Sequence, residues 1–192
     1  MMVTRRSSGT FNWIEDRIRK FRKRQRKKPN AFRVLAHGDS WTSHINGKTA
    51  IKQLHKNDEL NLVVIGSPGY ELSDIINGYN RLELATNPNW LKRQTYDLVL
   101  LSIGGNDILA NAYELMHNYQ PGQGAEAHVN LDALNQRIRT IKRNYLKLLL
   151  TIQDLLPEAK IAAHGYDYTI PNSNGDKIFG GFISIGPWTE DD

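Results

Sequence analysis

The chain has 192 residues, of which 40% are hydrophobic and 23% are charged, a composition typical of one globular domain rather than of a disordered or fibrous protein. It contains no cysteine, which excludes disulfides, thiolate metal sites and cysteine nucleophiles. No apolar run approaches the ~20 residues that a membrane-spanning helix needs, and the basic N-terminus lacks the apolar stretch of a secretory signal. These features predict a soluble, cytoplasmic protein.

The net charge of +5 hides two regions of opposite sign. Residues 1–33 hold twelve Lys and Arg against two acidic residues, a net +10, whereas the rest of the chain carries −5. A block of like charge is often an interaction tail. We therefore expect residues 1–30 to form a basic helical arm and residues 31–192 to form the main domain.

Within the arm, Ile14, Ile18 and Phe21 recur at helical spacing before Pro29, which predicts a helix with one narrow apolar face. The simplest interpretation is that this face packs on the domain while the basic face stays in solvent. The alternatives are contact with an anionic surface and docking to a partner protein. Aromatic residues are sparse among the basic ones and no nucleic-acid-binding motif accompanies them, so there is no firm nucleic-acid signal.

From residue 32 onward, short apolar runs alternate with helical patterns. The predicted strands lie at 32–36, 60–65, 97–103 and 160–163, and the predicted helices lie at 49–56, 71–84 and 131–156. We also expect a polar surface insertion at 118–130 and a loop at 165–186. Strands that alternate with helices imply parallel pairing with right-handed crossovers. The sequence therefore predicts a three-layer, flavodoxin-like α/β domain whose last helix and edge strand are missing.

Ligands of an open parallel sheet bind at the carboxyl ends of its strands, near the point where the strand order reverses. The segments that follow the four predicted strands are 37–41 (HGDSW), 66–70 (GSPGY), 104–107 (GGND) and 164–167 (HGYD). Each alone has a simpler interpretation as a turn or a helix cap. None matches the dinucleotide or P-loop pattern, and the histidines lack the spacing of metal ligands, so we expect neither a nucleotide cofactor nor a metal.

Together, these segments offer the parts of a serine hydrolase site. A serine at the tip of a strand, such as Ser40, can present its Oγ above the sheet. Its backbone N–H, the N–H of a glycine on the next loop and the amide of Asn106 could supply three donors to a developing oxyanion. Asp107 is expected to order a loop rather than to act on substrate.

The segments GDSW at 38–41 and GGND at 104–107 resemble the first and third sequence blocks of the GDSL, or SGNH, serine hydrolases, with matching order and spacing. The resemblance runs from about residue 32 to the end, and Gly69 stands where the oxyanion glycine of that family lies. It implies an SGNH-hydrolase fold, Ser40 as the nucleophile, and an oxyanion hole from the Ser40 N–H, the Gly69 N–H and the Asn106 side chain. It also implies acyl or acetyl esters of small molecules, carbohydrates or lipids as substrates, and no cofactor.

The family's fourth block, D-x-x-H near the C-terminus, supplies the general base and the carboxylate that orients it. No Asp of this sequence is followed three residues later by His, and without a base a serine hydroxyl is a weak nucleophile. We therefore expect the chain to be the N-terminal portion of a longer hydrolase, a fragment cut near Trp188, and the activity of the 192 residues alone stays open.

Two histidines fall on the predicted rim. His37 is expected to end its strand hydrogen-bonded to a loop, and His164, followed by Asp167 in the reverse order H-x-x-D, is expected to shape the pocket wall. Asp39, Asp107 and His164 are thus predicted to support the site. The alternative function is a catalytically inactive hydrolase scaffold that uses the basic arm to bind polyanions or a partner.

Overall fold

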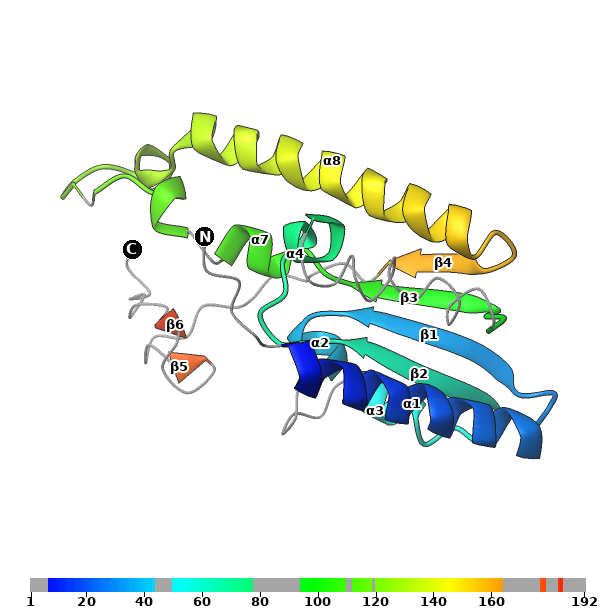
Figure 1. The fold of residues 1–192 in the computed structure, drawn as a ribbon. Helices are drawn as coiled ribbons and strands as arrows, with labels where there is room; N and C mark the ends of the chain where they lie inside the picture. Colours follow the sequence, from blue (N-terminus) through cyan, green and yellow to red (C-terminus); the bar gives the residue numbers. More distant parts are fainter. Residues whose placement is uncertain are drawn as a thin grey trace.

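The protein forms an α/β structure around one parallel sheet (Figure 1). The computed structural model describes residues 7–43, 50–77, 94–109, 112–118, 120–163, 177–178 and 183–184. Its four-stranded sheet has the order β2-β1-β3-β4 and consists of β1 (Phe32–Gly38), β2 (Leu60–Gly66), β3 (Leu98–Ser102) and β4 (Lys160–Ala163). The parallel pairing of these strands confirms the predicted α/β class with a parallel sheet.

Helices connect and flank the strands. They are α1 (Ser7–Lys27), α2 (Ser40–Ser43), α3 (Ala50–Leu54), α4 (Leu72–Asn77), α7 (Gly105–Leu109) and α8 (Leu131–Leu155), with 3-10 turns η1 (Ala112–Leu115) and η2 (Ala125–His128). The helix expected at 71–84 is confirmed over α4, and residues 78–84 lie outside the described residues. None of the helices in the described part of the chain is both long and apolar enough to cross a membrane.

One expectation of the sequence analysis is wrong in the C-terminal region. The segment 165–186, expected to be a loop, contains an antiparallel pair of short strands, β5 (Lys177–Ile178) and β6 (Ile183–Ser184). The overlooked signal is a Gly-Gly pair at 180–181 between apolar residues, since Gly-Gly between strand-forming residues is typical of a hairpin.

The crossovers place a topological switch point between β1 and β3. The connection that contains α3 packs on one face of the sheet, against Val34, Ala36 and Leu62. The connections that contain α4 and α8 pack on the other face, around Leu35 and Leu101. Successive connections leave β1 and β3 in opposite directions, and a crevice at the carboxyl ends of such a strand pair is where ligands of open α/β sheets bind.

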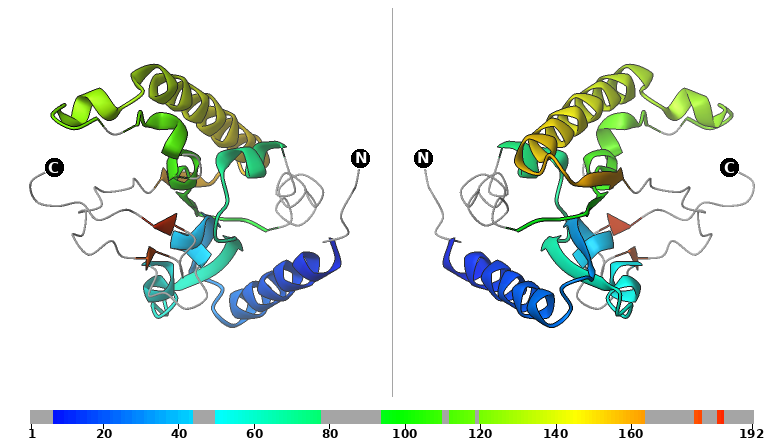
Figure 2. Two further views of the ribbon diagram at one scale, coloured as in Figure 1. Left: turned by 90° about the vertical axis from the view of Figure 1, so that its left-hand side faces the viewer. Right: turned by 90° about the vertical axis from the view of Figure 1, so that its right-hand side faces the viewer.

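Helix α1 packs on the same face of the sheet as α8, over the strand β2. Ile14, Ile18 and Phe21 are all buried there and contribute to one cluster with Leu35 and Ile65, which confirms the apolar face predicted for this helix. Figure 2 shows α1 and α3 on opposite sides of β2. The edge strand β2 is thus enclosed by a helix on each face.

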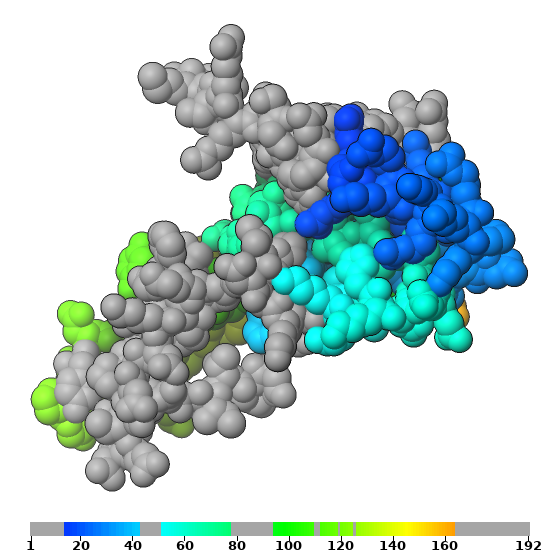
Figure 3. All heavy atoms as spheres, turned by 90° about the horizontal axis from the view of Figure 1, so that it is seen from below, coloured from blue at the N-terminus to red at the C-terminus, as the bar shows by residue number. Residues whose placement is uncertain are grey.

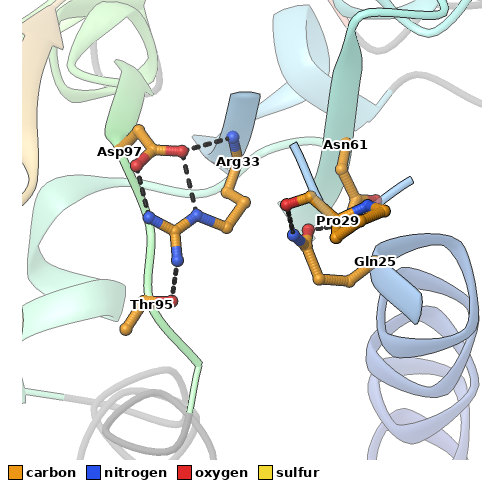
Figure 4. Close-up of polar contacts among 6 residues, drawn as sticks. All are labelled: Gln25, Pro29, Arg33, Asn61, Thr95 and Asp97. Carbon is orange, nitrogen blue, oxygen red and sulfur yellow. Dashed lines mark hydrogen bonds and ion pairs between the residues drawn. The ribbon is translucent and has the colours of Figure 1, made fainter. Parts of the chain in front are cut away.

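Polar contacts secure the amino ends of the strands, at the edge of the sheet opposite the switch point (Figure 4). Arg33 of β1 donates from its backbone N–H and from Nε to Asp97 Oδ2, at 2.7 and 2.9 Å, and a second ion-pair contact joins its guanidinium to Oδ1. Near the edge strand β2, Asn61 Nδ2 donates to Gln25 Oε1 of α1 at 2.7 Å, and Gln25 Nε2 donates to the carbonyl of Pro29 at 2.8 Å. These bonds tie β1 to β3 and α1 to β2, and they leave the carboxyl edge free for a site.

Candidate active site at the carboxyl edge of the sheet

Three strands approach one another unusually closely at the switch point. Gly38 ends β1 and pairs with Gly66 of β2 on one side and with Ser102 of β3 on the other. A Cβ atom on Gly38 would lie 2.0 Å from the Ser102 carbonyl oxygen, and one on Gly66 would lie 2.2 Å from the Gly38 carbonyl oxygen. Only glycine fits at these two positions, because a side chain would overlap the backbone of the neighbouring strand.

The chain turns sharply after Gly38 and presents Ser40 as the first residue of α2. Asp39 is almost fully buried, and its Oδ1 accepts the N–H of Trp41 at 3.0 Å. Its carbonyl accepts both the N–H and the Oγ1 hydroxyl of Thr42, at 3.1 and 2.7 Å. Asp39 therefore shapes the turn as a helix cap, and Ser40 is held at the sheet edge with 8% of its surface exposed.

The glycine loop after β2 is held by two neighbouring residues of α7. Asn106 Nδ2 donates to the carbonyl of Tyr70 at 2.9 Å, and Asp107 Oδ2 accepts the N–H of Leu72 at 2.9 Å. Gly69, just before this anchored stretch, has φ +83°, a left-handed conformation that favours glycine, although nothing lies within 4 Å of the position of a Cβ. The second and third motifs of the sequence are therefore in direct contact.

Asp107 has an unusual electrostatic environment. Burial raises the pKa of its carboxyl group to about 6, the Leu72 N–H opposes this rise, and the nearby Glu71 and Asp74 carboxylates add to it. Arg137 of α8 donates to the carbonyl of Asp107 at 3.1 Å and pairs with Glu114 at 2.9 Å. The guanidinium thus secures the backbone of α7, whereas the side-chain carboxyl has no cationic partner among its described hydrogen bonds.

Two contributions from α8 were missed by the sequence analysis. One is Arg137, and the other is Tyr145, whose Cε2 lies 3.9 Å from the position of a Cβ on Gly104 and whose pKa is raised by burial and by the Asp39 carboxylate. Both side chains come from the long crossover helix α8. Arg137 lies 30 residues after Asp107 in the sequence. No local motif marks them, because their place at the site follows only from the packing of α8 on α4 and α7.

The histidines do not form a catalytic pair with Ser40 in the described structure. His37 is 1% exposed, and neither ring nitrogen has a hydrogen-bond partner. Burial lowers the pKa of its imidazole to about 4, so the ring is neutral at pH 7. This corrects the expectation that His37 would be hydrogen-bonded to a loop. His164 and Asp167, the other candidates at the rim, lie outside the described residues.

An apolar hollow of about 250 Å³ adjoins the residue that follows Ser40. It lies on the face of the sheet that α3 covers, and Trp41, Leu54, Leu100 and Ala162 line it together with Ser102 at the end of β3. Trp41 is 54% exposed despite its large apolar ring. In the part of the chain that the structure describes, no three His, Asp or Glu side chains gather as a metal ion would require.

Comparison with known proteins gives matches among solved structures. No family model matches the chain, and no curated protein matches it. A structure from Parabacteroides merdae ATCC 43184, described as a GDSL-like lipase, is 16% identical with a TM-score of 0.38 and covers 70% of this chain and 59% of its own. One described as a platelet activating factor from Streptococcus pneumonia is 18% identical with a TM-score of 0.38 and covers 79% of this chain and 56% of its own.

A third structure is the family 3 carbohydrate esterase of Clostridium thermocellum, which is 18% identical with a TM-score of 0.32 and covers 80% of this chain and 87% of its own. The chain spans less than two thirds of the length of the first two structures, 59% and 56%.

Proposed function

We propose that this chain is the hydrolase domain of an SGNH-type serine esterase, in which Ser40 attacks the carbonyl carbon of an acyl or acetyl ester. The observation that supports it most is the 2.9 Å hydrogen bond from Asn106 Nδ2 to the Tyr70 carbonyl. This bond joins the GGND segment to the glycine loop, and both adjoin the turn that carries Ser40. Three separate sequence segments with the residue types of an acyl-transfer site therefore lie at one edge of the sheet.

The proposed reaction is a double displacement. Ser40 Oγ forms a bond to the carbonyl carbon, its proton passes to a base, and the π electrons move onto the carbonyl oxygen. That oxyanion accepts hydrogen bonds from the backbone N–H groups of Ser40 and Gly69 and from the second Nδ2 hydrogen of Asn106. Collapse breaks the bond to the alcohol, which leaves with a proton, and water then hydrolyses the acyl-enzyme to release the acid and restore Ser40.

The site needs a base that takes the proton of Ser40. His37 does not make this contact, because neither of its ring nitrogens has a hydrogen-bond partner among the described residues. The family resemblance would assign this role to a D-x-x-H block, which the sequence lacks. We therefore infer that Ser40 reacts slowly in this chain, and that a small soluble base increases its rate.

For the acyl group, we propose that a short chain enters the apolar hollow beside Trp41. Its volume of about 250 Å³ and its apolar lining, which includes Leu54, Leu100 and Ala162, favour a short hydrocarbon tail over a sugar. On this basis p-nitrophenyl butyrate should be a better substrate than p-nitrophenyl acetate, because each buried methylene contributes up to about 0.8 kcal/mol.

The proposal is tested by labelling and turnover together. The wild-type chain should form a covalent adduct with a fluorophosphonate, at Ser40 by peptide mass spectrometry, and should hydrolyse p-nitrophenyl butyrate. Ser40→Ala should abolish both, whereas Ser73→Ala on α4 should keep both, since that serine is not part of the proposed machinery. An unlabelled Ser40, or turnover that survives Ser40→Ala, would refute the proposal.

Chemical rescue tests the inference about the base. Imidazole should raise the rate of Ser40-dependent turnover by at least about tenfold, a conservative fraction of what general-base catalysis contributes. The rate that imidazole alone produces is subtracted with Ser40→Ala as the blank. A Ser40-dependent rate that imidazole leaves unchanged would mean that the chain already supplies its own base.

A further inference from the structure

A second concave surface runs along the free edge of β2, and it shares Thr42 and Ile51 with the lining of the apolar hollow beside Trp41. It is a groove of about 460 Å³ between α1 and α3, within the range of small-molecule sites. Figure 3 looks at this edge, with α1 in blue and the α3 region in cyan. We call it the α1–α3 groove, and Ser40, Gly69 and Asn106 are not among the described residues that line it.

The walls of the α1–α3 groove carry one sign of charge. Its basic lining residues are Arg17, Lys20 and Arg24 from α1, and Lys52 and His55 from the α3 side. Among the described residues that line it, none is acidic. Lys20 is paired with Asp16, which lies outside the groove. A concave surface lined by one sign of charge attracts ligands of the opposite sign, so the described lining favours an anion.

The arginines of α1 act on the opposite wall of the groove, as the pKa of His55 shows. The Arg17 guanidinium is half-buried and donates from Nη1 to the carbonyl of Val64 on the edge strand at 2.7 Å. Burial lowers the pKa of His55, and the charges of Arg24 and Arg17 lower it further. The positive charges of Arg17 and Arg24 on α1 therefore reach the α3 side of the groove, where the imidazole of His55 is neutral at pH 7 and can still donate an N–H.

The floor of the groove is apolar rather than polar. Ile51, Leu62 and Val64 contribute to it, together with the buried ring of Phe21. A cationic rim over an apolar floor matches a ligand with an anionic head and a hydrocarbon body. It fits an added peptide strand less well, because Arg17 already occupies the Val64 carbonyl that such a strand would pair with.

We propose that the α1–α3 groove binds an anionic amphiphile, a hydrocarbon chain with a carboxylate or phosphate head. The head lies between Arg24 and His55, beside Arg17, and the chain lies on Ile51 and Leu62. Ser40 is not among the described residues that line this groove, and binding there does not depend on ester hydrolysis, so its test needs no turnover.

Calorimetric titration with decyl phosphate below its micelle concentration tests the proposal. The expected result is one site per chain, with affinity rising up to about fourfold per methylene from octyl to decyl phosphate. Inorganic phosphate should bind at least about tenfold more weakly, and decyltrimethylammonium should not bind. If inorganic phosphate binds as tightly, or if the cationic amphiphile binds equally, the amphiphile proposal is wrong.

Two variants of α1 with the same change in net charge separate a specific site from general attraction. Arg24→Glu should weaken decyl phosphate binding at least about tenfold, because Arg24 lines the groove. Lys23→Glu reverses an exposed charge one residue away and should change binding less than about twofold. Equal losses in the two variants would overturn the proposal, as would binding of a short RNA without binding of decyl phosphate. Ser40→Ala should bind decyl phosphate like the wild type, and a loss there would assign the amphiphile to the hydrolase site instead.

Discussion

Replacing Asp107 by asparagine should make the protein more stable at pH 8, although it removes a charged residue of a conspicuous motif. Asp107 is 6% exposed, and its Oδ2 accepts the N–H of Leu72 at 2.9 Å. Burial is the main reason that the pKa of its carboxyl group rises to about 6 from the ordinary value of 3.8. Asparagine has the same shape and keeps an oxygen that can accept the Leu72 N–H, but it never carries the buried charge.

The size of the stability gain in Asp107→Asn follows from the difference between the pKa values of the Asp107 carboxyl group in the folded and unfolded states. Between pH 4 and pH 6 the folded state holds a proton on Asp107 that the unfolded state has lost, so the free energy of unfolding falls as the pH rises through this window. A difference of about two pKa units corresponds to up to about 3 kcal/mol. This stability is fully present below about pH 4 and is lost above about pH 6.

Urea unfolding followed by circular dichroism at pH 4, 6 and 8 measures this difference. Asp107→Asn should match the wild type within about 1 kcal/mol at pH 4 and exceed it by about 2–3 kcal/mol at pH 8. Asp154→Asn, a change at an exposed carboxylate on α8, corrects for the general loss of a negative charge. Asp107→Ala should instead be less stable than Asp107→Asn at every pH by about 1–3 kcal/mol, because the buried Leu72 N–H loses its acceptor.

The reasoning would be refuted if Asp107→Asn were less stable than the wild type at pH 8. It would also fail if the difference between the two proteins did not change between pH 4 and pH 8. Either result would mean that the Asp107 carboxylate is stabilised in the folded state by more than the Leu72 N–H, and that its ionised form, not its neutral form, holds the glycine loop.

Three further predictions follow from the packing and from the proposed site. Gly66→Ala should lower the free energy of unfolding by more than about 3 kcal/mol in the same urea assay, because its Cβ would lie 2.2 Å from a backbone oxygen. The control Gly124→Ala has open space around its Cβ and a φ of −68°, so it should leave the free energy of unfolding unchanged or raise it by up to about 1 kcal/mol. Leu148→Ala should lower the free energy of unfolding by about 2–5 kcal/mol and Leu150→Ala by less than about 0.5 kcal/mol, because these two residues of α8 are 1% and 56% exposed. Similar losses of stability in the two variants would contradict the assigned core. Asn106→Ala should lower kcat for p-nitrophenyl butyrate about 10²–10³-fold with native circular dichroism, and an unchanged kcat would remove Asn106 from the oxyanion hole.

Much of the fold could be predicted from local patterns. The strand at 97–103 was recognisable because it is apolar at nearly every position, and the structure has β3 at Leu98–Ser102. The helix expected at 131–156 is α8, Leu131–Leu155, whose start is capped by Asn130 Oδ1 accepting the Ala133 N–H at 3.1 Å. Such elements are determined by short-range periodicity and capping, which the sequence records directly.

The state of His37 could not be predicted in the same way. Its position at the end of a strand, next to the GDSW segment, was compatible with a hydrogen bond to a loop. The structure instead buries the ring without a partner for either nitrogen. The surroundings of this side chain come from several elements that are distant in the sequence, and no local pattern encodes whether they offer a polar group.

The sequence by itself determined the alternating elements, the apolar face of α1 and the three motif segments that follow the strands. Only the tertiary structure decided that Asn106 contacts Tyr70, that Asp107 holds Leu72, and that α1 and α3 form a basic groove along β2. The physical reason is range. Hydrophobic periodicity and glycine-rich turns act over a few residues. The hydrogen bonds of Asp107 and Asn106 join residues that are 35 and 36 positions apart, and these bonds and the charges of the groove depend on how the sheet brings its edges and helices together.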